Sequence, residues 1–179
     1  MKLIAIAIVA AATISCATAH NPIPEQAEPS YRLVLESSDI DDRRVGAPTA
    51  KTEATLVVFF ASWCGPCRHE LGIIGELVRE SPGLRVIGLN DYEEWSDRSD
   101  ETKLRKFVGE NAPWLRVVRA SAAHLKAFGG VPKIPTVFVF DRYGRVVREF
   151  RRDRREPPSK AELERAVTDA RTRSLQARR

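Results

Sequence analysis

Two cysteines placed directly after a predicted strand constrain this chain more than any other feature. Residues 55–60 read Thr-Leu-Val-Val-Phe-Phe, an apolar run rich in β-branched and aromatic residues that is typical of a buried parallel strand. Cys64 and Cys67 follow shortly afterwards, with Gly65 and Pro66 between them. The pattern predicts a strand, a tight turn and a helix whose start carries two thiols, which is an arrangement suited to redox chemistry.

The two cysteines are not equivalent in this pattern. Cys67 begins a stripe of apolar residues at spacings of four, three and four, so it is expected on the buried face of the helix. Cys64 falls at the helix N-terminus, where unpaired backbone N–H groups and the positive end of the helix dipole favour a thiolate. We therefore expect an exposed, acidified Cys64 as the nucleophile and a covered Cys67 as the resolving thiol. The stripe consists of Cys67, Leu71, Ile74 and Val78.

A zinc site is the main alternative for a Cys-x-x-Cys pair. Structural zinc takes four ligands, commonly two such pairs or one pair with two histidines. The chain holds three cysteines and three histidines in all. Cys16 and His20 lie in or beside a predicted leader, His69 projects from a different side of the helix, and His124 belongs to a separate segment. A redox pair is therefore favoured, and no metal is expected.

Further motifs strengthen the redox interpretation. The segment around the cysteines and a later segment containing a proline resemble the thioredoxin superfamily, specifically its extracytoplasmic TlpA-like and ResA-like branch. The joint occurrence of the two segments is more specific than either alone. The similarity extends over residues 31–170. It rests on Ala61-Ser62-Trp63, Cys64-Gly65-Pro66-Cys67, Glu70, Ile134-Pro135-Thr136 and Asp141-Arg142-Tyr143-Gly144.

This resemblance implies an α/β, thioredoxin-like fold over residues 31–175, in which helices flank a central mixed β-sheet on both faces. It also implies that Pro135 is cis and lies against the cysteine pair, although only about one X–Pro bond in twenty is cis in folded proteins. In this superfamily the main chain beside that proline pairs with a substrate strand. The expected active-site and substrate-binding loops contain Trp63, Gly65, Pro66, Ile134, Pro135 and Thr136.

Glu70 has two interpretations. It lies three residues after Cys67, so its carboxylate would project from nearly the same side of the helix and exchange protons with the cysteine pair. Alternatively, it is a surface acid placed favourably in the first turns of a helix. Thioredoxins keep a buried aspartate where this chain has Val58, which favours Glu70 as the functional carboxylate. The branch usually has proline at the position of Gly72. Gly72 and Gly75 would allow a bend or close packing of the helix, although each glycine costs about 1 kcal/mol of helix stability relative to alanine.

The N-terminus predicts export. A positively charged start precedes an apolar run at residues 3–12, which has the length of a signal-peptide core and is too short to cross a membrane. We expect a signal peptide at residues 1–19. The alternative is a lipoprotein signal at residues 1–15, after which Cys16 would tether the chain to a membrane. Residues 20–30 are rich in proline and are expected to form a linker.

The rest of the chain predicts alternating strands and helices. Residues 31–36 alternate in hydropathy and predict a strand, and the polar residues 37–53 predict a loop with a short hairpin. A strand–helix–strand crossover implies parallel pairing. Later strands are expected at 84–89, 114–118, 136–140 and 145–150, and later helices at 101–109, at 121–128 and from Ser159 onward.

Basic residues are concentrated near the end of the chain. The formal net charge is +5, and seven arginines lie between Arg142 and Arg155. Binding of nucleic acid is not expected, because an exported protein meets little of it and the run lacks interleaved aromatic residues. We expect these arginines on the solvent face or the exposed edge of the last hairpin.

Together these features predict a monomeric thiol–disulfide oxidoreductase that works outside the cytoplasm. The Gly-Pro dipeptide between the cysteines is that of thioredoxin, whose potential of roughly −270 mV contrasts with about −120 mV for the oxidant DsbA, so a reductant is expected. The resemblance implies protein disulfides as substrates, for example in cytochrome c maturation, and a membrane thiol as electron donor. No cofactor is expected beyond the redox-active disulfide Cys64–Cys67.

Two alternatives remain open at this point. A disulfide oxidase or isomerase would use the same residues at a higher potential. A protein of a different class would hold Cu(I) on the same cysteines for delivery, because soft thiolates suit that ion. No methionine or histidine accompanies the pair at a ligand-like spacing, which weighs against the copper interpretation.

Overall fold

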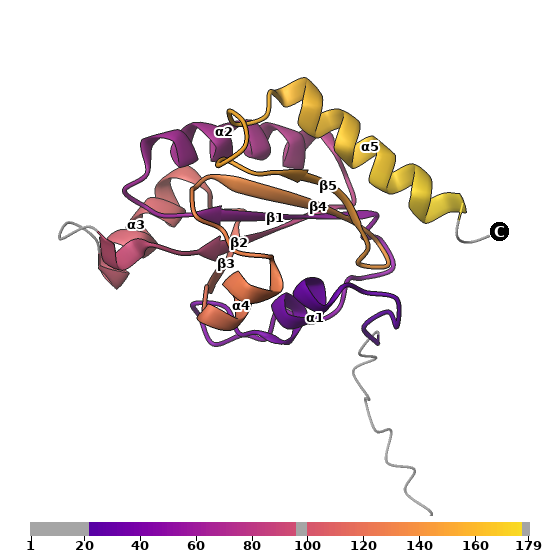
Figure 1. The fold of residues 1–179 in the computed structure, drawn as a ribbon, viewed down its shortest axis with the longest axis horizontal. Coiled ribbons are helices and arrows are strands. Elements are labelled where there is room, and N and C mark those ends of the chain that lie inside the picture. The colour runs from indigo at the N-terminus through magenta and orange to yellow at the C-terminus, as the bar shows by residue number, and fades with distance from the viewer. Residues whose placement is uncertain (1–21, 96–99, 177–179) are drawn as a thin grey trace, which may run out of the picture.

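The computed structural model describes residues 22–95 and 100–176. The predicted signal peptide and Cys16 lie outside the described residues. Helices and strands alternate along the described chain, and none of its helices has the length and apolar character needed to span a membrane (Figure 1). The elements are α1 (Pro29–Glu36), β1 (Ala54–Phe60), α2 (Gly65–Glu80), β2 (Leu84–Asn90), the 3-10 turn η1 (Glu93–Trp95), α3 (Glu101–Asn111), β3 (Arg116–Arg119), α4 (Ala122–Ala127), β4 (Thr136–Asp141), β5 (Val146–Phe150) and α5 (Lys160–Gln176).

The strands form one mixed sheet in the order β3-β2-β1-β4-β5. β1 runs parallel to β2, and β2 runs parallel to β3, as expected for strands joined by crossover helices. β4 pairs antiparallel with β1, and β5 pairs antiparallel with β4 to form the last hairpin. β1 is therefore the central strand, and all of its residues are buried. The predicted mixed sheet is confirmed.

Helices cover both faces of this sheet. Alternate residues of β1 point to opposite sides, so that Leu56 and Val58 join one apolar core while Val57 and Phe59 join the other. Side chains of α2, α3 and α5 complete the first core, and side chains of α1 and α4 complete the second. Figure 1 shows α2 and α5 above the sheet and α1 and α4 below it. The helix that carries the cysteines is thus anchored on the central strand.

The strand predicted at residues 31–36 is wrong, because this segment belongs to α1. Tyr31, Val34 and Leu35 are all buried, and their spacing is that of one helix face. Pro29 stands in the first turn, where a missing N–H costs nothing. The short hydropathy pattern of the segment is compatible with a strand or a helix. Packing of one face onto the second core selects the helix.

The fold also begins before residue 31. Ala27 is buried, and the N–H of Glu28 donates to the C=O of Gly144 at 2.9 Å. Gly144 has a φ of 77°, and a Cβ there would lie 2.3 Å from the ring of Tyr31. Glycine is therefore required on both counts. The end of the expected linker accordingly packs on the turn between β4 and β5.

Other predicted elements are present with small differences. The polar stretch 37–53 holds an isolated antiparallel bridge between Ser38 and Arg44 in place of a short hairpin. β3 starts two residues later than expected. Ser121 caps α4 through the N–H of His124, and Ser159 exchanges hydrogen bonds with Glu162 at the start of α5. Both predicted caps are confirmed.

Gly75 allows close packing on α2. A Cβ at this position would lie 3.0 Å from the indole nitrogen of Trp114, which is tighter than nearly all real contacts. Gly72 has open space beside it and does not serve the same purpose. The expectation of close packing therefore holds for one of the two helix glycines.

The arginines of the last hairpin lie at a sheet edge, as predicted, with one exception. β5 is an edge strand, and Arg148 on it is exposed. Arg151 is instead buried, and its guanidinium donates to the C=O of Phe128 at 3.0 Å and to the C=O of Gly130. It also lies 5.6 Å from the centre of the Phe138 ring. Arg151 thus holds the carbonyls at the end of α4.

Candidate active site

The cysteine pair lies where β1 ends and α2 begins. Cys64 is the N-cap residue of α2, and the N–H of Cys67 donates to the Cys64 sulfur at 3.1 Å. The two sulfurs are joined in a disulfide. After reduction, a Cys64 thiolate in this place would face the positive end of the helix dipole and that N–H, which is the predicted environment for a nucleophile.

Burial separates the two sulfurs less than the sequence pattern predicts. Cys64 is 5% exposed and Cys67 is fully buried. The prediction of an exposed Cys64 is therefore wrong in degree, because residues from three loops surround it. The sign of the difference is as predicted, since Cys64 lines a surface cavity while Cys67 faces the core beneath it.

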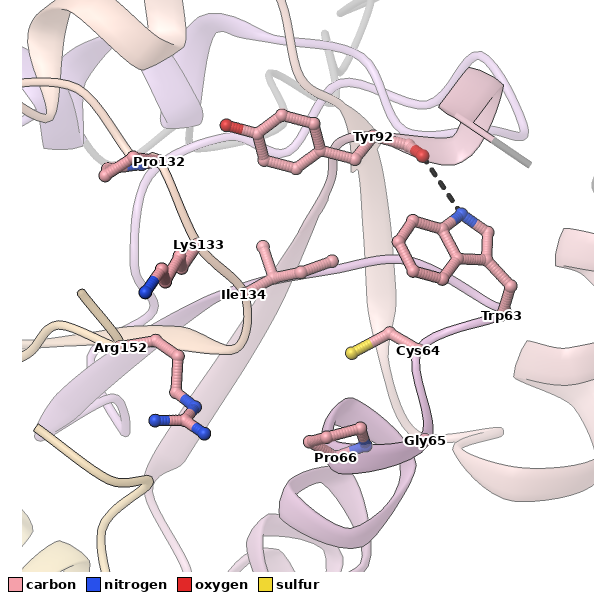
Figure 2. A pocket seen from close by; sticks show the side chains of 9 residues that line it. All are labelled: Trp63, Cys64, Gly65, Pro66, Tyr92, Pro132, Lys133, Ile134 and Arg152. Carbon is pink, nitrogen blue, oxygen red and sulfur yellow. Dashed lines mark hydrogen bonds between the residues drawn. The ribbon is translucent and has the colours of Figure 1, made fainter.

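A cavity of about 420 Å³ opens beside Cys64 (Figure 2). The Cys64 sulfur points into this space, and Ile134 lies opposite. Five of the lining residues were predicted from the sequence, and Tyr92, Pro132, Lys133 and Arg152 were not. Pro132 and Lys133 directly precede the proline motif, whereas Tyr92 and Arg152 belong to segments without a recognised motif. The cavity is lined by Trp63, Cys64, Gly65, Pro66, Tyr92, Pro132, Lys133, Ile134 and Arg152.

The peptide bond between Ile134 and Pro135 is cis, as the resemblance implies. Thr136 follows as the first residue of β4 and pairs with Phe59 near the end of β1, which brings the proline segment to the cysteine end of the sheet. Within the described residues, the main chain of Ile134 makes no hydrogen bond. Its N–H and C=O are therefore available to an extended peptide.

The hydroxyl of Thr136 stabilises the loop that contains Pro135. Thr136 Oγ1 donates to the C=O of Lys133 at 2.8 Å and accepts from the N–H of Arg152 at 3.1 Å. Thr136 itself is buried. Its role in the structure is to join the proline loop to the chain that leaves β5, while the neighbouring main chain faces the cavity.

Trp63 stands at the rim of the cavity and is 42% exposed. Its indole N–H donates to the C=O of Tyr92 at 3.0 Å (Figure 2). This bond fixes the ring orientation while one ring face stays in contact with solvent. Exposed aromatic surface beside the Cys64 sulfur is chemically suited to apolar contact with a peptide.

Glu70 is fully buried, so the surface-acid interpretation is wrong. Neither oxygen of its carboxyl has a hydrogen-bond partner among the described residues. Burial raises the pKa of Glu70 to about 7, and the positive charge of Arg155 opposes this shift in part. Glu70 lies one helical turn after Cys67, and its carboxyl is poised to gain or lose a proton near neutral pH.

Glu93 is a second buried carboxyl that the sequence analysis missed. It accepts hydrogen bonds from the Ser62 N–H at 2.9 Å, from the Ser62 hydroxyl, and from the Asn90 side-chain amide at 2.7 Å. Glu93 lies in η1, directly after β2. The sequence signal that could have identified Glu93 was an asparagine at the end of a strand, followed three residues later by a glutamate. This signal lies inside a stretch that predicts a polar loop. Glu93 fixes the segment just before the cysteines.

The two histidines among the described residues do not line the active-site cavity. His69 is exposed on α2, and buried His124 bonds to the hydroxyls of Ser37 and Ser121. Across residues 22–95 and 100–176, no three His, Cys, Asp or Glu side chains gather in a group that could hold a metal ion.

Known proteins share this sequence pattern. Residues 18–167 match the family model described as Redoxin. The thiol:disulfide interchange protein HelX of Rhodobacter capsulatus is 33% identical over 94 residues, which cover 51% of this chain and 48% of HelX. The thiol-disulfide oxidoreductase ResA of Bacillus thuringiensis is 24% identical over 119 residues, 64% of each chain. This chain thus spans less than two thirds of the length of either relative.

The fold is also similar to solved structures. A thioredoxin-like protein from Aeropyrum pernix matches with a TM-score of 0.63 and 17% identity, over 76% of this chain and 89% of that one. In this chain a strand, a Cys-x-x-Cys helix start and a cis-proline loop come together, and the family model covers most of the sequence. The chain therefore belongs to the Redoxin family and has a thioredoxin-like fold.

Proposed function

We propose that this protein is an extracytoplasmic thiol–disulfide oxidoreductase that reduces disulfides of exported proteins. The observation that carries the proposal is the Cys64–Cys67 disulfide, which caps α2 and lines a cavity whose opposite wall is the Ile134–Pro135 loop. A peptide in the cavity would meet a reactive sulfur on one side and unpaired main-chain groups on the other. The relatives HelX and ResA are named as thiol–disulfide proteins.

In the reduced protein, the Cys64 thiolate attacks one sulfur of a substrate disulfide. A mixed disulfide forms, and the other substrate sulfur leaves as a thiolate that takes up a proton. Cys67 then loses its proton and attacks the Cys64 sulfur, which closes the Cys64–Cys67 disulfide and releases the second substrate thiol. Two electrons and two protons thus pass from the dithiol to the substrate.

Glu70 supplies a proton acceptor for the second step. Cys67 is fully buried, so water cannot reach its thiol easily, whereas Glu70 lies one helical turn away with a pKa of about 7. A group with a pKa near the working pH is the most effective general acid or base. The carboxyl takes the Cys67 proton as the mixed disulfide resolves and returns it when the pair is reduced again.

The direction of electron flow is proposed from the motif. Gly65 and Pro66 stand between the cysteines as in thioredoxin, which lies near the reducing end of the family at roughly −270 mV. A reductant in an oxidising compartment needs a thiol donor in the membrane to regenerate it. Suitable substrates are apocytochrome c cysteines and the disulfides of other exported proteins, and cytochrome c maturation is the process that would need such a reductant.

Trapping of the mixed disulfide tests this mechanism. Cys67→Ser keeps the shape of the site but lacks the resolving thiol, so adducts with exported cysteine-bearing proteins should accumulate. Dithiothreitol should cleave these adducts by reducing the mixed disulfide. The matched control is the double variant Cys64→Ser/Cys67→Ser, which should form none. The proposal is falsified if the adducts are absent, or equally abundant in the double variant, because Cys64 would then not be the attacking thiol.

Two equilibrium measurements separate the alternatives. Exchange with glutathione should give a potential well below −200 mV, and a value above about −150 mV would indicate an oxidase or isomerase instead. Titration of the reduced protein with Cu(I) in competition with a chelator should show no tight stoichiometric binding. Tight copper binding together with no disulfide reductase activity would replace the proposal by a copper-delivery function.

A further inference from the structure

The charged residues on the wall of the active-site cavity are both cations. Lys133 and Arg152 line the cavity beside Cys64, and its described lining contains no carboxylate. Figure 2 shows the two side chains across the cavity from Trp63. Lys133 is exposed and makes no ion pair within the described residues. Its ammonium group is therefore available to a substrate.

A second basic cavity, of about 610 Å³, lies on the other side of Trp63. Arg68, Lys103 and Lys106 line it, and the Arg68 guanidinium lies 5.5 Å from the centre of the Phe107 ring, which forms part of the wall. Trp63 lines both cavities. A chain segment that crosses Cys64 over the Trp63 rim would therefore meet cations on both sides of its reacting cysteine.

Carboxylates near these cations offset the positive charge only in part. Arg152 pairs with the exposed Glu156 at 2.9 Å, and Lys106 lies 3.9 Å from Glu110 on the same helix. Such exposed pairs are weak and exchange readily with a competing anion. Lys103 has a similar long contact with Asp100.

The other carboxylates of the described residues do not line the two cavities. Asp91 and Glu94 line a different cavity on the far side of Tyr92. Glu70 is buried beneath the cysteines. The two cavities therefore present five cations against one lining carboxylate, Glu110.

We propose that the preferred substrate of this site is an acidic segment of a protein, with carboxylate side chains on both sides of the cysteine that Cys64 attacks. This inference rests on the proposed function, since only a disulfide substrate is held across Cys64. Main-chain pairing at Ile134 does not depend on the side chains of the substrate, so it cannot select among substrates. The cations supply the selection, because complementary charge favours the correct partner and rejects one of like charge.

Matched disulfide peptides test the proposal. Three peptides carry the same internal disulfide, flanked on both sides by glutamate, glutamine or lysine. The fully reduced protein is mixed with each, and loss of its thiols is followed in a single turnover. Each rate is divided by the rate of the same peptide with dithiothreitol, an uncharged reductant, because flanking charges alter the intrinsic reactivity of a disulfide.

The glutamate peptide should react about tenfold faster than the lysine peptide after this correction, and salt at about 0.5 M should remove the difference. Lys133→Gln and Arg152→Gln should each slow the glutamate peptide by about twofold, within the range of one exposed ion pair, and should slow the glutamine peptide less. Lys51→Gln and Arg79→Gln are the matched controls. Both residues are exposed, lie outside the two cavities, and carry the same change in charge.

The outcomes separate this inference from the proposed function. Equal corrected rates for the three peptides, or a preference for lysine, would overturn the acidic substrate and leave the oxidoreductase in place. Equal losses in the Lys51→Gln and Lys133→Gln variants would also overturn it, because net charge rather than the cavity would then set the rate. Failure to reduce any of the three peptides would overturn both proposals.

Discussion

Two buried carboxyl groups follow the cysteine motif along the chain, and their hydrogen-bonding surroundings are opposite. Glu93, in the turn after β2, accepts three hydrogen bonds from Ser62 and Asn90. Glu70, on the cysteine helix, has no hydrogen-bond partner among the described residues. Three donors hold the Glu93 carboxylate in one position, whereas burial without donors raises the pKa of Glu70. Glu93 therefore holds its segment in place, whereas Glu70 is suited to proton transfer.

Removal of Glu93 should have the largest effect on stability. Glu93→Ala leaves the two Ser62 donors and the Asn90 amide without their acceptor, and each unpaired buried donor costs about 1–3 kcal/mol. We expect the oxidised protein to lose about 4 kcal/mol of unfolding free energy in urea. The control is Glu94→Ala, which removes an exposed neighbour. Similar losses for the two variants would show that the hydrogen bonds of Glu93 are unimportant.

Glu70→Gln should raise the free energy of unfolding, in contrast to Glu93→Ala, and only at high pH. The folded pKa of Glu70 is about 7 and the ordinary value is 4.5, so the folded state binds the proton more tightly. Its contribution is fully present below about pH 4.5 and is lost as the pH rises through 7, a change of about 3 kcal/mol at most. Glutamine has no such loss, so the variant should be more stable than the wild type at pH 8 and about equal to it at pH 4.

This comparison is made on oxidised protein by urea unfolding across that pH range. Glu76→Gln serves as the control, because Glu76 is an exposed residue of the same helix. If the stability difference between wild type and Glu70→Gln does not change between pH 4 and pH 8, Glu70 does not titrate in this window.

A smaller effect is expected on the reactivity of the reduced cysteines. Iodoacetamide should label Cys64 much faster than Cys67, because only Cys64 lines the cavity. When Glu70 is ionised, its negative charge opposes thiolate formation, so Glu70→Gln should move the pH profile of Cys64 labelling down by about one pH unit. Turnover should slow as well, because the proton acceptor is gone. An unchanged profile with unchanged turnover would leave Glu70 without a function in the site.

The smallest effect is expected for Ser62→Ala. This change removes one of the three hydrogen bonds to Glu93 and keeps the bond from the Ser62 N–H, so the loss should be about 1 kcal/mol. The rate of Cys64 labelling should be nearly unchanged. A loss as large as that of Glu93→Ala would mean that the hydroxyl, and not the main-chain bond, fixes the segment.

The sequence predicted the centre of the fold better than its periphery. The run 55–60 is continuously apolar and the stripe after Cys67 has a helical period, and both form the expected elements. The segment 31–36 is short and alternates in hydropathy, which indicated a strand, and its packing on α4 and the sheet, which selects the helix, is not local. Propensity and pattern are weak wherever tertiary contacts choose between two structures.

The candidate site shows the same division. The cysteines, Glu70 and Pro135 were found because a motif fixes their spacing. Glu93 and Arg152 were missed, since each reaches the site through the order of strands in the sheet rather than through its neighbours in sequence. Lys133 was missed although it directly precedes the proline motif, because the motif does not include it. The depth of Glu70 was also undetermined, because residues three apart on a helix can be either buried or exposed at its edge.

The hydroxyl of Thr136 has a consequence for how substrate preference can evolve. It joins the C=O of Lys133 to the N–H of Arg152, and these are the residues that carry the two cations of the active-site cavity. The distance between the two charges therefore depends on a buried neutral residue that does not line the cavity. A methyl group in place of that hydroxyl would alter the spacing of carboxylates that the protein accepts, while every charged residue stayed the same. Related chains can thus diverge in selectivity through a position that a comparison of surface charge would overlook.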